Sequence, residues 1–392
     1  MALSVFVAFV GFQFSSPFMP LYIRELGVTD PGRIAMWSGL IAAATPAISG
    51  VLGPLFGRLA DRFGRKLMLI RSLVGFVVIV AVMGLVTSVE QLFLARLIQG
   101  LFAGFTPMAM ALASVSAPRD KVPVAISIVQ SAQLLSVAVG PAAGGYVASH
   151  HGIRAAFFVT AGMCAVALVA LIFLFQEVSA SGKPMARGAA ARLPMRQALR
   201  YPNFLLVLTL LLIAQFIDRG LALLIPLHVA HMPELTAIAA TSGAIISIAA
   251  VGATVSSNLS TRLARGIPTT RLLMIGLLAG GPLCALMALA HGWAALLVLR
   301  TLVAFCFGGA ITLAYALGAE IVPPEHRGAA FGWLALGVQV GTATSPLAMG
   351  ALAAWSIPGA YVFDGAIALT GAALLAFRWS RPMPATLRDV RP

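Results

Sequence analysis

The hydrophobic and polar positions of this chain alternate on a long scale, with apolar stretches of about 20 residues separated by short polar connections. Each stretch can cross a hydrocarbon layer of ~30 Å as a helix, since backbone groups in lipid must be paired internally. The first stretch has no basic region before it and no small-residue cleavage site, so we expect a retained helix. We therefore predict an all-α membrane protein with twelve spans, near residues 2–23, 35–56, 67–87, 91–114, 122–148, 155–176, 203–227, 236–257, 271–290, 294–318, 329–353 and 358–378.

Composition agrees with a protein that lies in a lipid bilayer. Of the 392 residues, 60% are hydrophobic and 10% charged, with a mean hydropathy of +0.97, whereas a soluble domain has about 25% charged residues. The net charge of +14 is divided among short loops and forms no continuous stripe, so nucleic acid is not an expected partner. The three cysteines lie in apolar stretches without metal-ligand spacing, and we expect no metal and no cofactor.

Lysine and arginine residues set the expected orientation. Most of the 26 lie in one set of connections, and the opposite set holds only Arg24, Arg33 and Arg154. Because basic loops remain on the cytoplasmic side, both termini are expected in the cytoplasm.

The two halves of the chain resemble each other on either side of a polar, basic linker at 177–201. Arg96 in "LFLARLIQGLFAG" has a counterpart in Arg300 of "LLVLRTLVAFCFGG", and "GPAAGG" (140–145) is echoed by "SPLAMG" (345–350). Duplicated six-helix halves are typical of alternating-access carriers with a site near the middle of the membrane, although a duplication could also build a purely structural bundle.

These features predict two pseudo-symmetric six-helix bundles. The expected organisation is an N-terminal bundle at 1–176, a cytoplasmic linker at 177–201, a C-terminal bundle at 202–378 and a cytoplasmic tail at 379–392.

Charge is concentrated in "GRLADRFGRK" at 57–66, where half of the residues are charged. This stretch resembles the signature between helices 2 and 3 of the major facilitator superfamily. Three further stretches resemble signatures of its twelve-helix drug:proton antiporter branch, and these are "GFQFSSPFMP" (11–20), "LFLARLIQG" (92–100) and "SVAVGPAAGG" (136–145), in which Ser136 replaces the usual glycine. The resemblance implies the major facilitator fold and a bacterial multidrug exporter.

The resemblance also implies gating residues. A topology anchor would explain the bases at 57–66, but it would not explain the single acid or the glycines, which permit a tight turn and close helix approach. In the family this Asp contributes to a cytoplasmic latch, and the start of span 11 would favour a carboxylate by about 0.3–1 kcal/mol. The copy at 261–271 lacks the acid, so we expect asymmetric gating. The glycine stripe of span 5 could alternatively serve ordinary packing. The expected gating residues are Gly57, Asp61, Arg62, Gly64, Arg65, Gly140 and Pro141.

Amides inside the spans indicate a cavity. Glutamines lie in spans 1, 4, 5, 7 and 11, whereas the interiors of spans 3, 6 and 9 have none, and an amide that faces lipid is costly. Each glutamine could alternatively serve an interhelical hydrogen bond. Together with aromatic side chains, these amides would suit an amphipathic small molecule, and the expected lining is Gln13, Phe14, Phe18, Gln99, Gln130, Gln133, Gln215 and Gln339.

Ionisable residues inside the spans are few. Arg96 matches the family's fourth-helix Arg, which is associated with proton coupling. Asp218 lies in span 7, which we expect to line the cavity, whereas Asp364 lies in span 12, which the family places at the periphery. We therefore expect a buried Asp218 to carry the proton, and a structural pair of Asp218 with Arg219 is the alternative.

The sequence thus predicts a monomeric, proton-coupled carrier in a bacterial inner membrane that exports amphipathic drugs, with the proton gradient as its energy source. A carrier for one metabolite, sugar or lipid, working as an importer or an exporter, would share this architecture, and so would a receptor or scaffold. A membrane enzyme is disfavoured, because the sequence has neither a nucleophile elbow nor an intramembrane cluster with metal spacing.

Overall fold

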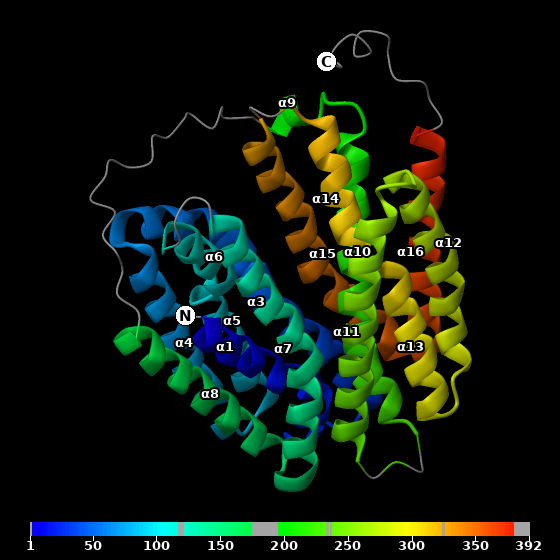
Figure 1. Ribbon diagram of the computed structural model, residues 1–392. Coiled ribbons are helices and arrows are strands. Elements are labelled where there is room, and N and C mark those ends of the chain that lie inside the picture. The colour runs from blue at the N-terminus through cyan, green and yellow to red at the C-terminus, as the bar shows by residue number, and fades with distance from the viewer. Residues whose placement is uncertain are drawn as a thin grey trace, which may run out of the picture.

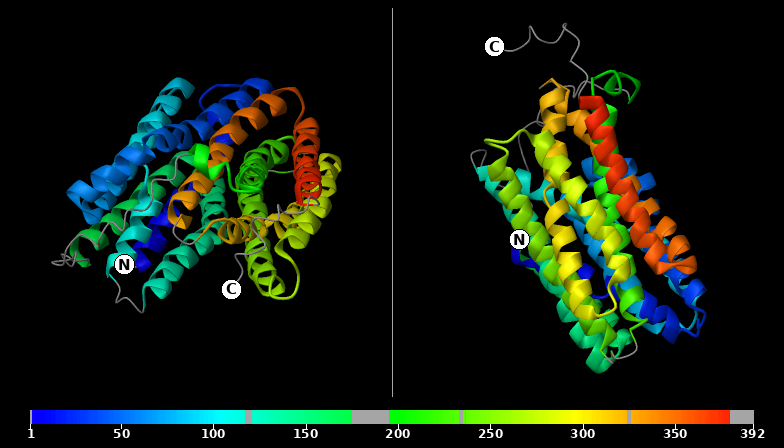
Figure 2. Two further views of the ribbon diagram at one scale, coloured as in Figure 1. Left: turned by 90° about the horizontal axis from the view of Figure 1, so that it is seen from above. Right: turned by 90° about the vertical axis from the view of Figure 1, so that its right-hand side faces the viewer.

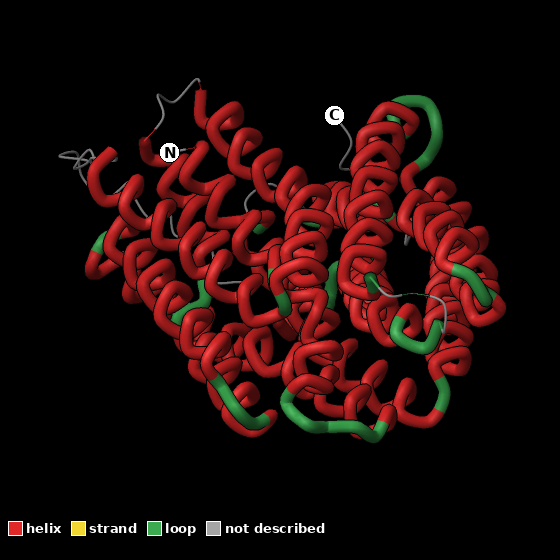
Figure 3. Tube along the Cα trace, turned by 90° about the horizontal axis from the view of Figure 1, so that it is seen from below, coloured by secondary structure: helices red, strands yellow, loops and turns green. Residues whose placement is uncertain are grey.

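Helices account for all regular structure in the described part of the chain (Figures 1 and 3). Most of the linker and of the C-terminal tail lies outside this part. The computed structural model describes residues 2–116, 121–174, 195–232, 235, 237–323 and 326–379.

Nine segments among the described residues are long and apolar enough to cross a membrane. One of them consists of α13 (Trp293–Phe307) followed by α14 (Ala310–Ile321), and one is extended by the single-turn helix η3 (Met287–Leu289). The other helices of this set are α3 (Pro31–Phe63), α4 (Arg65–Leu85), α7 (Val122–His151), α8 (Ile153–Leu174), α10 (Phe204–Val229), α11 (Ile238–Leu263), α12 (Thr269–Leu286) and α16 (Ile357–Trp379).

The remaining expected spans are helical as well. α1 (Ala2–Phe14) and α2 (Met19–Glu25) would together form a tenth span, bent by 51° around the single turn η1. α5 (Val89–Leu101) and α6 (Phe105–Ser116) occupy the fourth expected span, and α15 (Arg327–Trp355) occupies the eleventh. The all-α membrane fold is therefore confirmed, and α9 (Met195–Ala198) is a short helix that precedes α10.

The breaks in these helices follow from proline and glycine. Pro17, in η1 between α1 and α2, has no backbone N–H and so cannot continue the helical ladder. Gly104, between α5 and α6, has φ +106°, which a residue with a side chain rarely adopts. The freed carbonyls of Leu101 and Ala103 accept hydrogen bonds of 3.0 and 3.1 Å from the guanidinium of Arg71 on α4.

Each half of the molecule has its own core. Helices α1 to α8 lie beside α10 to α16 (Figures 1 and 2). The core of the second half holds residues from 198 to 375 and only Ala35 from the first half, while a core of the first half holds only Ala239 from the second. The two halves therefore fold around separate cores and meet through small side chains.

Candidate functional site

The interface between the halves is formed by two helix pairs, α3 with α15 and α7 with α11 (Figure 1). Gly39 on α3 packs directly on the backbone of Pro346 on α15, and Gly243 on α11 packs directly on the backbone of Pro141 on α7. A Cβ atom at either glycine would overlap the facing carbonyl oxygen, so only glycine permits these contacts.

These contacts obey the internal duplication. Pro141 and Pro346 hold equivalent places in the echoed segments at 140–145 and 345–350. One turn further along each helix, Gly145 packs on Ala239 and Gly350 packs on Ala35. A hydrogen bond of 3.0 Å from the N–H of Ala142 to Ser247 Oγ also joins α7 to α11. We call this part of the interface the closed end, formed by Ala35, Gly39, Pro141, Gly145, Ala239, Gly243, Pro346 and Gly350.

The halves separate toward the other end of the same helices. Gly50 lies about three helical turns beyond Gly39 and therefore on the same face of α3. No heavy atom lies within 4 Å of the Cβ position at Gly50 or Gly53 of α3, or at Gly332 of α15. Val51 is 80% exposed. We call this part the open end, formed by Gly50, Gly53 and Gly332, and it is the end from which α3 leads into α4.

The motif at 57–66 lies at this open end, and only part of it is a turn. Gly64, with φ +92°, ends α3 and precedes α4, so its expected role in a tight turn fits the backbone. Gly57, by contrast, lies inside α3, which runs to Phe63, so the expectation of a turn there was wrong. Arg62 is exposed, with its guanidinium 5.2 Å from the ring centroid of Phe63. The side chains of Asp61 and Arg65 lie outside the described part.

The two expected gating residues of α7 face different neighbours. Pro141 contacts the opposite half, as described above. Gly140 faces α1 instead, because a Cβ there would lie 2.7 Å from Cβ of Gln13.

Arg96 on α5 is held by neutral groups. Its Nη1 donates to Oε1 of Gln99 at 3.0 Å, and Thr45 on α3 donates to the Arg96 carbonyl at 2.9 Å and to Gln99 Oε1 at 3.3 Å. Among the described side chains, no acid forms an ion pair with Arg96. Gln133 makes no side-chain hydrogen bond to this group among the described residues.

Arg300 on α13, the counterpart of Arg96, has an acidic partner. Its Nη2 lies 3.1 Å from Oδ1 of Asp218 on α10, and the side chains are 7% and 53% exposed, respectively. Asp218 thus pairs across helices with Arg300 and not with its neighbour Arg219, and it is half-exposed where a buried site was expected. Adjacent helix positions diverge around the axis, so Asp218 and Arg219 need not meet. The sequence shows the symmetry of the two arginines but not this pair, because the pair depends on how α10 and α13 are placed.

Asp364 on α16 is fully buried, although a peripheral position was expected for its helix. α16 packs against α10, α12 and α15, so one of its faces points into the second half. Neither carboxylate oxygen has a hydrogen-bond partner among the described residues.

The expected cavity-lining residues fall into three groups. Gln130 and Gln339 are exposed, and each lies about three turns from a closed-end residue on the same helix face, so both face the separation between the halves. Gln13 and Gln133 are half-buried, and Gln99 and Gln215 are buried. Phe14 and Phe18 are 5% and 0% exposed within the core of the first half, so in this conformation they line no cavity, contrary to expectation.

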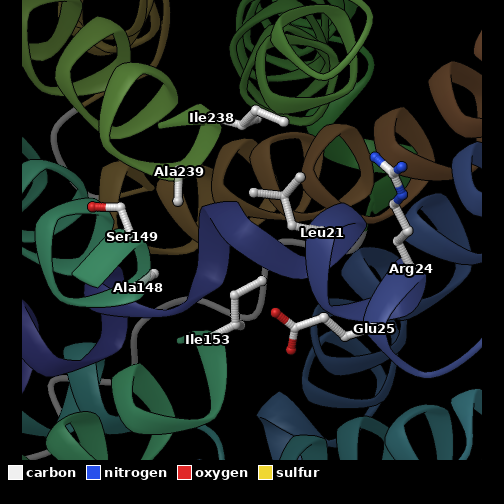
Figure 4. Close-up of a pocket in the computed structure, with 8 residues that line it drawn as sticks. All are labelled: Leu21, Arg24, Glu25, Ala148, Ser149, Ile153, Ile238 and Ala239. Atoms are coloured by element: carbon white, nitrogen blue, oxygen red, sulfur yellow. The ribbon is translucent and has the colours of Figure 1, made fainter. Parts of the chain in front are cut away.

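A pocket of about 460 Å³ lies beside the closed end, between α2, α7, α8 and α11 (Figure 4). Its lining includes Leu21, Glu25, Ile153 and Ile238. The Glu25 side chain extends toward Ile153, whereas the Arg24 guanidinium points away from it (Figure 4). Within the described residues, no group of His, Cys, Asp and Glu side chains has the arrangement of a metal site.

The chain matches one family profile and is similar in sequence to several known proteins. The sequence profile described as the Major Facilitator Superfamily matches residues 1–291 and 234–392. The multidrug resistance protein MdtG of Salmonella arizonae is 30% identical over 379 residues, which cover 95% of this chain and 91% of the relative. The multidrug resistance protein MdtG of Klebsiella pneumoniae is 34% identical over 280 residues, which cover 70% of this chain and 67% of the relative.

Solved structures show the same fold. A bacterial homologue of the human lysosomal transporter Spinster, in an inward-facing and occupied conformation, matches with a TM-score of 0.75 at 17% identity, covering 98% of this chain and 97% of its own. A mutant of the nucleoside transporter NupG matches with a TM-score of 0.71 at 14% identity, covering 97% and 100%. At these identities the likeness concerns the fold alone.

Proposed function

The chain belongs to the major facilitator superfamily, and from that membership we propose that it exports amphipathic drugs or toxic compounds in exchange for protons. It is a multi-pass secondary transporter and not an enzyme. The observation that carries the export proposal is the 30% identity, over 95% of the chain, to proteins named for multidrug resistance.

The geometry supports alternating access. The halves touch at the closed end through backbone and small side chains, and they separate at the open end. The distribution of Lys and Arg supports a cytoplasmic position for the open end, with the basic turn after α3, in a bacterial inner membrane. A monomer in this conformation receives its substrate from the cytoplasm, and the exposed Gln130 and Gln339 offer the substrate amide contacts.

The proton site is proposed to be Asp218. Its carboxylate is half-exposed, so water can deliver a proton, and Arg300 stabilises the ionised form from a nearly buried position. Protonation removes the charge that Arg300 binds, and this frees α10 from α13. Arg96 holds the equivalent place in the first half and is proposed to assist coupling through Gln99.

The gates are proposed at opposite ends. Pro141 is proposed to act at the closed end, where it contacts Gly243 on α11. Gly140 is proposed to support this contact by packing α7 closely against Gln13 on α1. When the molecule turns outward, Asp61 and its neighbours Gly57, Arg62, Gly64 and Arg65 are proposed to latch onto the start of α15, where the helix dipole favours a carboxylate.

A drug-susceptibility panel in an exporter-deficient bacterial host tests this function. Cells that express the protein should tolerate several unrelated amphipathic compounds, and a protonophore should abolish the tolerance. Transport of a single metabolite without competition from these compounds would contradict multidrug export.

A further inference from the structure

The second half contains a buried acid that the proposed mechanism does not yet use. Asp364 is 0% exposed, and no donor of the described residues reaches either of its oxygens. It lies against α10, because a Cβ atom on Gly220 would be 3.1 Å from Asp364 Oδ2. Gly220 is two residues from Asp218, so Asp364 and Asp218 lie at the same level of α10, although residues two apart point to different sides of a helix.

The two hydroxyl groups nearest to Asp364 are engaged elsewhere. Ser345 on α15 donates to the carbonyl of Phe216 at 2.5 Å. The Tyr361 hydroxyl, one turn earlier on α16, shares a hydrogen bond of 3.2 Å with Nδ1 of His228. A buried carboxylate without a donor is very costly, so the group is held as a neutral acid. Asp364 therefore keeps its proton in this conformation.

Arg300 has an unused donor in the same cluster. Its Nη2 is bound to Asp218, but its Nε is buried and lacks an acceptor among the described residues. Arg300 and Asp218 both act electrostatically on Asp364. The cluster thus has one cation, two carboxyl groups, and a single ion pair in place.

The titratable and charged groups that face Asp364 can be named helix by helix. α10 brings Asp218 and His228, α12 brings the buried Cys284, and α13 brings Arg300, while α15 contributes only the hydroxyl of Ser345. Tyr361 is on the same helix as Asp364. Asp218 is thus the other acid of this cluster among the described residues.

We propose that Asp364 is a second proton-binding group of the carrier, which alternates with Asp218 as the partner of Arg300. The inference rests on the proposed proton coupling. In this conformation Asp218 is ionised and paired, and Asp364 carries the proton. When Asp218 takes a proton from water, an O–H bond forms there and its pair with Arg300 breaks.

Arg300 then turns to Asp364, whose O–H bond breaks as the proton leaves to water. One proton has entered at Asp218 and one has left from Asp364. The cluster keeps one positive and one negative charge throughout, so no unpaired charge is left in the membrane at either stage. The exchange also couples α16 to the state of α10 and α13.

Infrared spectroscopy on protein labelled with 13C-aspartate, in an ester-free detergent, tests the protonation state directly. The carbonyl stretching band of a neutral acid should be present in the wild type and lost in Asp364→Asn. It should also be lost in Asp218→Asn, because Arg300, deprived of Asp218, turns to Asp364 and displaces its proton. Asp364→Asn should also fold normally, since a neutral amide replaces a neutral acid of the same shape. An unchanged band in Asp364→Asn would overturn the proposal.

Transport in vesicles with an imposed pH gradient tests the exchange. Proton-driven transport by Asp364→Asn should fall by roughly 100-fold, while Glu90→Gln, a matched change at an exposed acid, should leave it intact. Wild-type pH dependence in Asp364→Asn would overturn the exchange and leave the proposed function standing. If transport by the wild type does not depend on the proton gradient, proton coupling itself is overturned. The infrared band then still reports whether Asp364 is protonated, so failure of proton coupling and failure of the exchange can be told apart.

Discussion

Arg96 and Arg300 hold equivalent places in the two halves, and their surroundings differ in one decisive respect. Both precede a helix break, since α6 begins at Phe105 and α14 at Ala310, which are equivalent positions to within one residue. The guanidinium of Arg96 binds the amide oxygen of Gln99, whereas that of Arg300 binds the carboxylate of Asp218. The duplication thus preserved the scaffold, and a titratable partner is present beside only one of the two arginines among the described residues.

In the gating motif the acid is present in the first half and not in the second, which is the reverse of the distribution around the two arginines. The acid of the 57–66 stretch is in the first half, and the corresponding stretch at 261–271 has lost it. The second half therefore carries the ion pair inside the membrane, and the first half carries Asp61 near the cytoplasmic end of α3. We interpret this as a division of labour, with proton coupling in the second half and closure in the first.

The largest effect is expected from Asp218→Asn, which removes the asymmetry between the two arginines. Arg300, 7% exposed, would lose its only ion-pair partner in the described part. Because proton-transferring groups contribute about 100-fold or more, proton-driven efflux should be abolished while substrate binding persists. Transport assays in vesicles measure the proton-driven efflux, and equilibrium binding assays measure the affinity for substrate. Full pH-dependent transport by this variant would move the coupling role to another acid.

The next largest effect is expected at the closed end, from Gly39→Ala and from its symmetry mate Gly243→Ala. Each added methyl group would overlap a proline carbonyl oxygen, and overpacking of this kind costs about 1–3 kcal/mol, or roughly 5- to 150-fold in a population. Both variants should shift the carrier toward the outward-open state, measurable by labelling of single cysteines near Ile238. The exposed Gly266→Ala serves as the control. Unequal shifts would show that the two contacts are not mechanically equivalent.

Arg96→Lys tests the arginine that binds a neutral amide and not a carboxylate. Lysine keeps the charge but loses the planar fork that reaches Gln99, and a hydrogen bond to a charged group is worth about 1.5 kcal/mol, or roughly tenfold. Coupled transport should fall by about this factor, with little change in expression or thermal stability. If Arg96→Ala still drives proton-dependent efflux, Arg96 has no part in coupling.

The smallest effect is expected from Asp61→Asn. A carboxylate at a helix N-terminus gains about 0.3–1 kcal/mol, so closure on the cytoplasmic side should weaken by roughly two- to fivefold. Transport should fall while expression and topology remain, and cysteine labelling at Gly53 should increase. Wild-type transport with unchanged labelling would exclude the latch.

The helices could be predicted from the sequence because a membrane imposes a length on every apolar stretch. The twelve spans, the echo of Arg96 in Arg300 and the turn at Gly64 all depend on local pattern. Phe14 and Phe18 were misplaced because an aromatic residue on a helix is equally suited to a core and to a cavity wall. The boundary of α3 was misplaced because charged residues continue a helix beyond the lipid.

The partners of charged residues could not be predicted, because they depend on how helices rotate against one another. Asp218 meets Arg300 only once α10 and α13 are placed. Asp364 belongs to a helix at the edge of the molecule, but a peripheral helix still has one inner face. The guanidinium of Arg71 binds two carbonyls that are left without helical partners because α5 ends at Leu101.

The paired contacts at the closed end restrict the mechanics of the molecule. Two rigid bodies that touch at two points, Gly39 on Pro346 and Gly243 on Pro141, retain one easy rotation about the line between those points. The touching surfaces are backbone and small side chains, so each half can rotate against the other without large side chains having to separate. During this rotation the contact between the halves moves along α3 and α15 toward Gly50 and Gly332. The helix ends farthest from the contact are displaced more than the residues close to it. A single methyl group added on the contacting faces of α3 and α15 would hold the halves apart, and its effect would depend on its distance from the axis of rotation.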